Sequence, residues 1–256
     1  MRFKSLGSGS TGNATLVQTT GPNGRNLLID CGFGLRHLQV RLEKAGVLIQ
    51  DLDAIFITHE HGDHIGCVQA LSDKHRIPVW MSAGTSAAMN FDNTSGSLNL
   101  ARDGHEIGLG NLRLTPFTVP HDARAPLQIT CTDGQAKLGI LTDLGHATDH
   151  VVNHLKGCNS LLLECNHDSD MLAASSYPGF LKLRVGGNHG HLSNSQAADV
   201  ARAVQHSDLR HVVAAHLSQQ NNLPTLAGQM LAKALSRQLN DIVIATPDEG
   251  CAWLDV

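Results

Sequence analysis

The stretch Thr58–His64, with the sequence Thr-His-Glu-His-Gly-Asp-His, constrains this chain more than any other. It brings three imidazoles and a carboxylate within six positions, directly after the apolar run of residues 52–57. Such nitrogen and oxygen ligands suit Zn or Mn, whereas structural metal sites usually close with four ligands and favour cysteine. The alternating spacing of His59, His61 and Asp63 predicts an extended segment or tight loop with these three side chains on one side and His64 on the other flank. One loop could therefore hold two metals.

Length and charge limit the number of domains and the ways in which the chain could bind nucleic acid. The chain has 256 residues, of which 41% are hydrophobic, and its net charge is -4. We expect a single domain over residues 1–256 with a substantial core. Because the chain is mildly acidic, a nucleic-acid substrate would have to be held locally by metals and a few Arg or Lys side chains. Aromatic residues make up only 4% of the chain, so stacking surfaces for bases are few.

Cysteine spacing and hydropathy suggest where the protein works. The six cysteines form no C-x-x-C pair, and we interpret them as free thiols in a reducing cytoplasm. The N-terminal residues contain no apolar segment of signal-peptide length, and no stretch approaches the ~20 apolar residues of a membrane span. We therefore expect a cytoplasmic protein without membrane contact.

Hydrophobic periodicity predicts strands and helices that alternate along the chain. Strands are expected at 2–6, 14–19, 25–31, 53–58, 77–81, 112–119, 127–132, 137–141, 160–164, 212–215, 242–245 and 252–254, and helices at 34–45, 65–74, 82–89, 149–155, 196–205 and 224–239. Residues 91–110 are weakly patterned. Strand-rich sheets interleaved with helices, in two similar halves without a linker, predict an α+β fold: an αββα sandwich of two mixed β-sheets flanked by helices.

Polar residues follow several of these strands. His121, Asp143 and His216 come after strands 112–119, 137–141 and 212–215, which makes them probable partners of the first motif. Asp30 follows another apolar run and is either a partly buried carboxylate that orients a ligand or a turn or capping residue. The Gly- and Ser-rich turn 7–13 could cradle an anion or be a plain hairpin turn.

Seven motifs together resemble the metallo-β-lactamase superfamily, and within it the YycJ/WalJ-type exonuclease branch, which is related to RNase Z and the PhnP phosphodiesterases. They lie at Leu6–Asn13, Thr58–His64, His121–Ala123, Leu141–Asp143, Glu164–Asp168, Gly190–Asn194 and Ala215–Ser218. The resemblance implies two divalent ions, Zn or Mn, one held by His59, His61 and His121 and the other by Asp63, His64 and His216, with Asp143 between them. It also implies 5′-to-3′ exonuclease action on single-stranded DNA.

The chemistry implied by the resemblance is phosphodiester hydrolysis. Two divalent ions lower the pKa of a shared water and neutralise charge on the attacked group. Histidine at position 61, where redox di-iron relatives carry a carboxylate, favours a hydrolytic site. Asp63 would orient the attacking hydroxide, and His191, with His189 and His167 as alternatives, would protonate the departing oxygen. Substrate contacts are expected from Ser8, Ser10, Asn13, His167 and Arg184.

Other functions remain open from the residues alone. A small cyclic-phosphate phosphodiesterase would use the same ligands, as would a thioester or lactam hydrolase of the same fold. A non-catalytic metal sensor is a further alternative. The ligand types suit both Zn and Mn, and nothing in the pattern predicts an oligomeric state.

Overall fold

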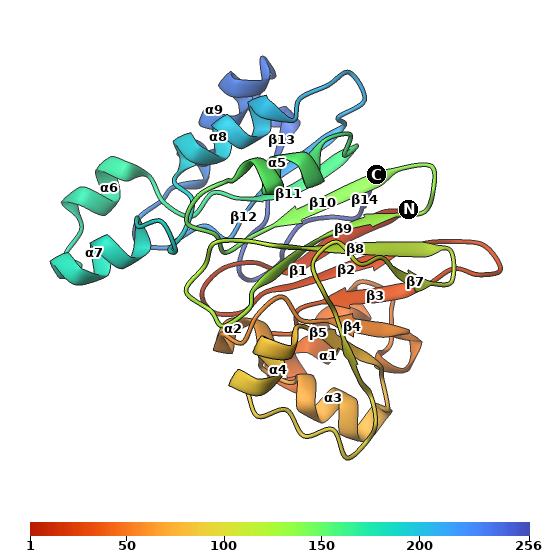
Figure 1. Ribbon diagram of the computed structural model, residues 1–256. Coiled ribbons are helices and arrows are strands. Elements are labelled where there is room, and N and C mark those ends of the chain that lie inside the picture. The colour runs from red at the N-terminus through yellow and green to blue at the C-terminus, as the bar shows by residue number, and fades with distance from the viewer.

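The computed structural model describes residues 1–256 as four layers, with two β-sheets face to face and helices over both outer faces (Figure 1). The first sheet has seven strands in the order β14-β1-β2-β3-β4-β5-β6. These strands are β1 (Arg2–Gly7), β2 (Ala14–Gln18), β3 (Asn26–Ile29), β4 (Ala54–Phe56), β5 (Val79–Met81), β6 (Leu98–Leu100) and β14 (Leu254–Asp255). The expected αββα sandwich is thus confirmed.

The second sheet also has seven strands, in the order β13-β12-β11-β10-β9-β8-β7. Its strands are β7 (Ile107–Leu109), β8 (Leu112–Thr118), β9 (Leu127–Thr132), β10 (Lys137–Leu141), β11 (Ser160–Glu164), β12 (His211–Ala215) and β13 (Ile242–Ile244). Each sheet contains three antiparallel pairs followed by three parallel pairs. Both sheets are therefore mixed, and the two halves repeat one plan.

The helices lie on the outer faces and at one end of the sandwich (Figure 1). They are α1 (Leu35–Lys44), α2 (Gly62–Ile65), α3 (Val68–His75), α4 (Ala83–Ala88), α5 (Asp149–Leu155), α6 (Ser169–Ala174), α7 (Gly179–Val185), α8 (Asn194–Ala203) and α9 (Pro224–Leu235), with short 3₁₀ turns at Ile49–Asp51 and Leu239–Asp241. Helix α8 is capped by Ser193, whose hydroxyl accepts a hydrogen bond from the Gln196 backbone N–H. No helix combines the length and apolar character needed to cross a membrane.

Three apolar clusters bind the layers together. The central cluster packs residues of the first sheet, such as Phe3 and Phe56, against residues of the second, such as Ile140 and Val213. A second cluster joins the first sheet to α1 and α3, and a third joins the other sheet to α5, α8 and α9. Each sheet is thus apolar on both faces, which explains the nearly continuous apolar strands of the sequence.

Three predictions about elements were wrong or incomplete. The helix expected at 65–74 is two helices, α2 and α3, separated at Gly66, where the chain packs too closely against the Cys31 and Phe33 backbone for a Cβ. Helix α9 ends at Leu235, because Ser236 turns into the left-handed conformation with φ 54°. The weakly patterned residues 91–110 contain β6 and β7, short strands at the edges of the two sheets.

Candidate metal centre

Strand direction brings the expected ligands to one end of the sandwich. Strands β10, β11 and β12 are parallel, so Asp143, Glu164 and His216 meet at the same edge of the second sheet. In the first sheet β3 and β4 are parallel, and Asp30 and the loop that begins at His59 follow their carboxyl ends. The carboxyl ends of parallel strands are the usual place for ligands in α/β sheets.

All seven expected ligand residues come together at this end. The ligand atoms of His59, His61 and His121 lie within 4.8 Å of one another, and so do those of Asp63, His64 and His216. Asp143 lies between the two groups, since it is within the same range of His59 from the first group and of His64 and His216 from the second. The structure therefore groups these residues as the resemblance implies.

The side-chain arrangement predicted for residues 58–64 was wrong in one respect. His59, His61 and Asp63 do not share one side, because residues 62–65 form the helical turn α2 rather than an extended segment. That turn carries Asp63 away from His59 and His61 and toward His64 and His216. The hydrogen bond from the His64 N–H to the His61 carbonyl, at 2.9 Å, closes the turn.

Four of the imidazoles have one ring nitrogen bonded inside the protein. The Nδ1–H groups of His64 and His121 donate to Asp30 Oδ2 at 2.8 Å and to the Gly190 carbonyl at 3.0 Å. His59 Nδ1 lies 3.0 Å from the Thr58 hydroxyl, which itself donates to Asp30. His216 Nδ1 donates to Glu164 Oε1 at 3.0 Å. Metal-binding histidines typically donate their second N–H in this way, which leaves Nε2 for the ion.

Two ring nitrogens without a partner indicate whether the cluster suits a metal. Nε2 of His59 and Nε2 of His216 are buried and have no hydrogen-bond partner. Buried polar atoms in proteins are normally paired, so each of these two atoms needs a partner that the protein does not supply. One lies in each ligand group, and a divalent ion would satisfy both. The donor set therefore fits divalent metals.

Asp30 and Glu164 are the buried carboxylates behind the ligands. Asp30 is 4% exposed and holds His64 directly and His59 through Thr58, which are the contacts expected of a carboxylate that orients a neighbouring ligand residue. Glu164 is fully buried and accepts from His191 Nδ1, from His216 Nδ1 and from the Leu144 and Leu192 backbone N–H groups. Glu164 was not among the site residues predicted from the sequence. The signal was there, since Glu164 ends an apolar strand just as Asp30 follows one.

The charges of the cluster depend on these contacts. Burial raises the pKa of Glu164, but the His191 and His216 imidazoles outweigh it and lower this pKa to about 2. Burial likewise acts against ionisation of Asp63, yet the imidazoles of His216 and His64, whose Nε2 atoms lie 3.6 and 3.5 Å from Asp63 Oδ2, hold its pKa far below the usual range. Burial lowers the pKa of His59 well below its ordinary value, which favours the neutral, metal-binding imidazole. The carboxylates are thus ionised.

The backbone at three of these positions is held in an unusual conformation. Asp30, Asp143 and His216 have φ values of 58°, 52° and 54°, in the left-handed region that residues other than glycine rarely adopt. Each directly follows, or lies within two residues of, the end of a strand. Strained backbone of this kind is typical of functional sites, where the surrounding packing enforces it.

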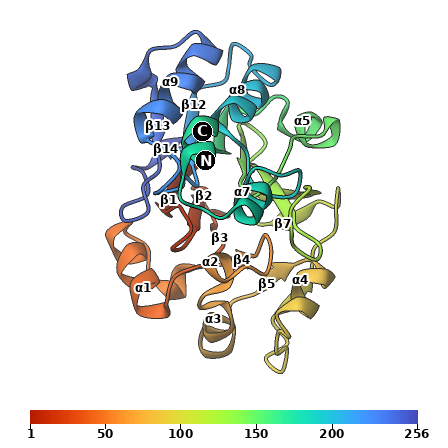
Figure 2. The same cartoon turned by 90° about the vertical axis from the view of Figure 1, so that its left-hand side faces the viewer.

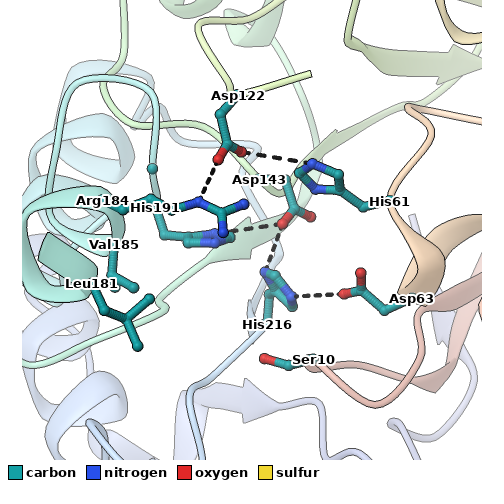
Figure 3. A pocket seen from close by; sticks show the side chains of 11 residues that line it. Ser10, His61, Asp63, Asp122, Asp143, Leu181, Arg184, Val185, His191 and His216 are labelled. Atoms are coloured by element: carbon teal, nitrogen blue, oxygen red, sulfur yellow. Dashed lines mark hydrogen bonds and ion pairs between the residues drawn. The ribbon is translucent and has the colours of Figure 1, made fainter. Parts of the chain in front are cut away.

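A polar pocket of about 190 Å³ opens onto the cluster (Figure 3). Among its lining residues are His61, Asp63, Asp143 and His216 from the ligand groups, together with Ser10, Asp122, Arg184 and His191. Leu181 and Val185 are its two hydrophobic lining residues. Asp122 was not among the site residues predicted from the sequence. In the structure its Oδ2 accepts a 2.7 Å hydrogen bond from Arg184, and its Oδ1 lies 3.4 Å from His121 Nε2.

The expected substrate contacts differ in position. Ser10 and Arg184 line the pocket, whereas Ser8, Asn13 and His167 are buried and do not. The Asn13 side-chain amide donates to Asp63 Oδ2 at 3.1 Å, and the Ser8 hydroxyl accepts from the backbone N–H of His216 at 2.8 Å. Turn 7–13 thus contacts the ligand residues from behind. Of the three expected proton donors only His191 lines the pocket, because His189 is exposed outside it.

Comparison with known proteins agrees with this geometry. The profile described as "Beta-lactamase superfamily domain" matches residues 25–217. The chain is 31% identical to the exodeoxyribonuclease YycJ of Bacillus anthracis, over 93% of this chain and 90% of that protein. It is 30% identical to the exodeoxyribonuclease WalJ of Streptococcus pneumoniae, over 92% and 88%. Among solved structures, the metallo-β-lactamase fold protein YhfI of Bacillus subtilis shares the fold with a TM-score of 0.76, 17% identity and coverage of 99% and 98%.

Proposed function

Because this chain belongs to the beta-lactamase superfamily, we propose that it is a divalent-metal-dependent phosphodiester hydrolase that removes nucleotides from single-stranded DNA in the 5′-to-3′ direction. The observation that carries the proposal is the pair of ligand groups joined through Asp143 at one open, polar pocket. Relatives named as exodeoxyribonucleases, which match more than nine-tenths of the chain, support the choice of a DNA phosphodiester as substrate.

Charge in the pocket supports an anionic substrate only when cations are bound. Asp63, Asp122 and Asp143 line the pocket, and the single Arg184 is already paired with Asp122. A phosphodiester would be repelled by three carboxylates at this range unless metal ions neutralised them. Nine of the eleven lining residues are not hydrophobic, which suits a charged ester better than an apolar acyl group.

The ligand residues would hold two ions, Zn or Mn, in the grouping given above. Bound there, divalent ions supply Lewis acidity and lower the pKa of water. Asp63 stays ionised and would accept a hydrogen bond from the attacking water, which orients it toward phosphorus. As the new P–O bond forms, the bond to the departing nucleotide breaks, and that oxygen needs a proton.

His191 is the residue that would supply this proton. Its Nδ1–H donates to Glu164 Oε1 at 2.9 Å, so Nε2 is the ring nitrogen available to the pocket that His191 lines (Figure 3). Burial acts to lower the pKa of His191, but the Glu164 carboxylate outweighs it and raises that pKa. A protonated imidazole at this position can donate from Nε2 to the departing oxygen.

Other parts of the chain support the proposal less directly. Ser10 and Arg184 line the pocket and would contact phosphate oxygens, whereas Ser8 and Asn13 would act from behind the ligands. His167 is buried and does not line the pocket. All six cysteines are free and buried, which supports the proposal that the protein works in the reducing cytoplasm.

A time course on oligonucleotides labelled at the 5′ or the 3′ end tests the function. With added Mn or Zn we expect stepwise loss of nucleotides from the 5′ end of single strands and no activity after chelation. His61→Ala should abolish the activity, while His37→Ala, an exposed histidine of α1, serves as the matched control. Hydrolysis of a cyclic phosphate, a thioester or nitrocefin in preference to DNA would contradict the proposal.

A further inference from the structure

Helix α7 carries the most exposed large apolar side chains of the molecule. Phe180 is 74% and Leu183 78% exposed, compared with 50% or less for every other exposed large hydrophobic residue. The chain has six Phe, two Trp and one Tyr, and Phe180 is the only one of these nine that is exposed. No residue of α7 is buried. Two adjacent apolar side chains on a helix without a core contact indicate a binding surface.

The same helix forms one wall of the metal pocket. Leu181, Arg184 and Val185 line the pocket, and Figure 3 shows them facing the ligand cluster from α7. Successive residues of an α-helix are separated by roughly 100°. Viewed down the axis, the side chains therefore follow the order Leu183, Phe180, Arg184, Leu181, Val185. The exposed pair thus continues the pocket wall outward, with Arg184 between the apolar pair and the pocket.

The charge of α7 also suits a phosphate chain. Its sequence, Gly-Phe-Leu-Lys-Leu-Arg-Val, contains Lys182 and Arg184 and no acidic residue, in a chain with net charge -4. Figure 1 shows α7 projecting from one end of the sandwich, beyond both sheets, and Figure 2 shows it at the front of that end. A strand of nucleic acid that leaves the pocket along α7 would meet Arg184 and then the apolar pair, whereas Lys182 lies on the other side of the helix.

We propose that Phe180 and Leu183 form a binding platform for unpaired nucleobases next to the scissile phosphate. This inference rests on the proposed function. One base stacks on the Phe180 ring, the next packs on Leu183, and Arg184 faces the backbone phosphate between them and the pocket. Only unpaired bases expose a face for stacking, so the platform selects single strands. Removal of one stacking aromatic weakens binding by roughly ten-fold or more.

A second copy of this chain is the main rival occupant. Two side chains on a seven-residue helix offer far less than the ~800 Å² that each partner buries in a stable protein interface. The absence of acidic residues from α7 and the position of this helix beside the metal pocket favour a nucleic acid instead. Sedimentation velocity of the wild type and of Phe180→Ala separates the two occupants.

The test compares two substrates of the metal-loaded protein. For Phe180→Ala we expect the ratio of KM for a single-stranded oligonucleotide to KM for bis-p-nitrophenyl phosphate to rise about ten-fold. For Leu183→Ala, which removes no aromatic ring, we expect a smaller rise. Phe180→Tyr should restore this ratio to the wild-type value. Leu48→Ala, at a residue that is 44% exposed, directly before the 3₁₀ turn Ile49–Asp51 and outside the pocket, is the matched control and should leave the ratio unchanged.

Abasic substitution in the oligonucleotide gives the sharper readout. Removing the base at the platform position should weaken wild-type binding, measured by fluorescence anisotropy, and should have no further effect on Phe180→Ala. Additive effects of the two changes, or a dimer that Phe180→Ala dissociates, would overturn the platform. If the wild type hydrolyses neither ester, the proposed function fails, and the anisotropy measurement still decides the platform.

Discussion

At the scale of single residues, the buried carboxylates Asp30 and Glu164 determine what the histidines can do. Each accepts hydrogen bonds from imidazole Nδ1–H groups, and the Nε2 atoms of these imidazoles therefore face the ligand cluster. Both could be recognised from sequence as carboxylates next to apolar strand residues, but only Asp30 was. The partners of Glu164, at positions 191 and 216, are too distant in sequence for spacing to reveal them.

Glu164→Gln tests this role. A glutamine amide offers one acceptor oxygen where Glu164 uses two, so either the imidazoles or the backbone N–H groups lose their partner. We expect metal affinity to fall about 10- to 100-fold, measured by competition with a chromogenic chelator. Glu60→Gln, in the metal loop but outside the ligand groups, is the control. Unchanged affinity would exclude Glu164 as a positioning residue.

His191→Ala tests the proton donor. If His191 protonates the departing oxygen, kcat should fall by about 10²- to 10⁴-fold while metal content stays at the wild-type level. His189→Ala provides the matched control, because His189 lies two residues away and does not line the pocket. Turnover of His191→Ala close to that of the wild type would remove His191 from the mechanism.

At the scale of elements, the loops after β3 and β4 pack against each other without room for a side chain. A Cβ at Gly32 would lie 1.7 Å from the Asp63 carbonyl oxygen, and the Asn13 N–H donates to that same oxygen at 2.8 Å. Close backbone contact, rather than side chains alone, therefore sets where α2 lies. This explains why the spacing of residues 59–64 failed to predict the direction of Asp63.

Gly32→Ala should displace the ligand-bearing loop of residues 58–64. The methyl group must push the Asp63 backbone away, so we expect weaker metal binding and lower activity together with a loss of stability of about 1–3 kcal/mol. Gly34→Ala is an informative comparison, because a Cβ at Gly34 meets nothing within 4 Å. Equal metal affinity and equal urea midpoints for the two variants would contradict this account of the loop.

At the scale of the whole molecule, the ligand residues come from both sheets. His59 to His64 follow β4 of the first sheet, and His121, Asp143 and His216 follow strands of the second. Bound ions would therefore link the two halves across the end of the sandwich. The central cluster already joins the sheets, and we propose that residues 1–256 unfold as one domain.

Removal of metal should lower the stability of this domain. At a free metal concentration 1,000 times Kd, binding contributes about 4 kcal/mol, which for a chain of this size corresponds to a shift in Tm on the order of 10 °C. Thermal unfolding monitored by circular dichroism, with and without chelator, measures the shift and the number of transitions. A Tm unaffected by verified metal loss, or two separate transitions, would contradict the prediction.

The sequence by itself predicted the αββα class, and its resemblance to a known superfamily implied the seven residues that meet at one end of the sandwich. The class follows from local information, since periodicity predicts elements, whereas the strand directions that carry the seven residues to a shared edge come from the tertiary structure. Only the tertiary structure decided the role of Glu164, the position of Asn13 behind Asp63 and the exposure of Phe180. The two hydrogen-bond contacts join residues about 50 positions apart, and the exposure depends on whether any other element packs against α7.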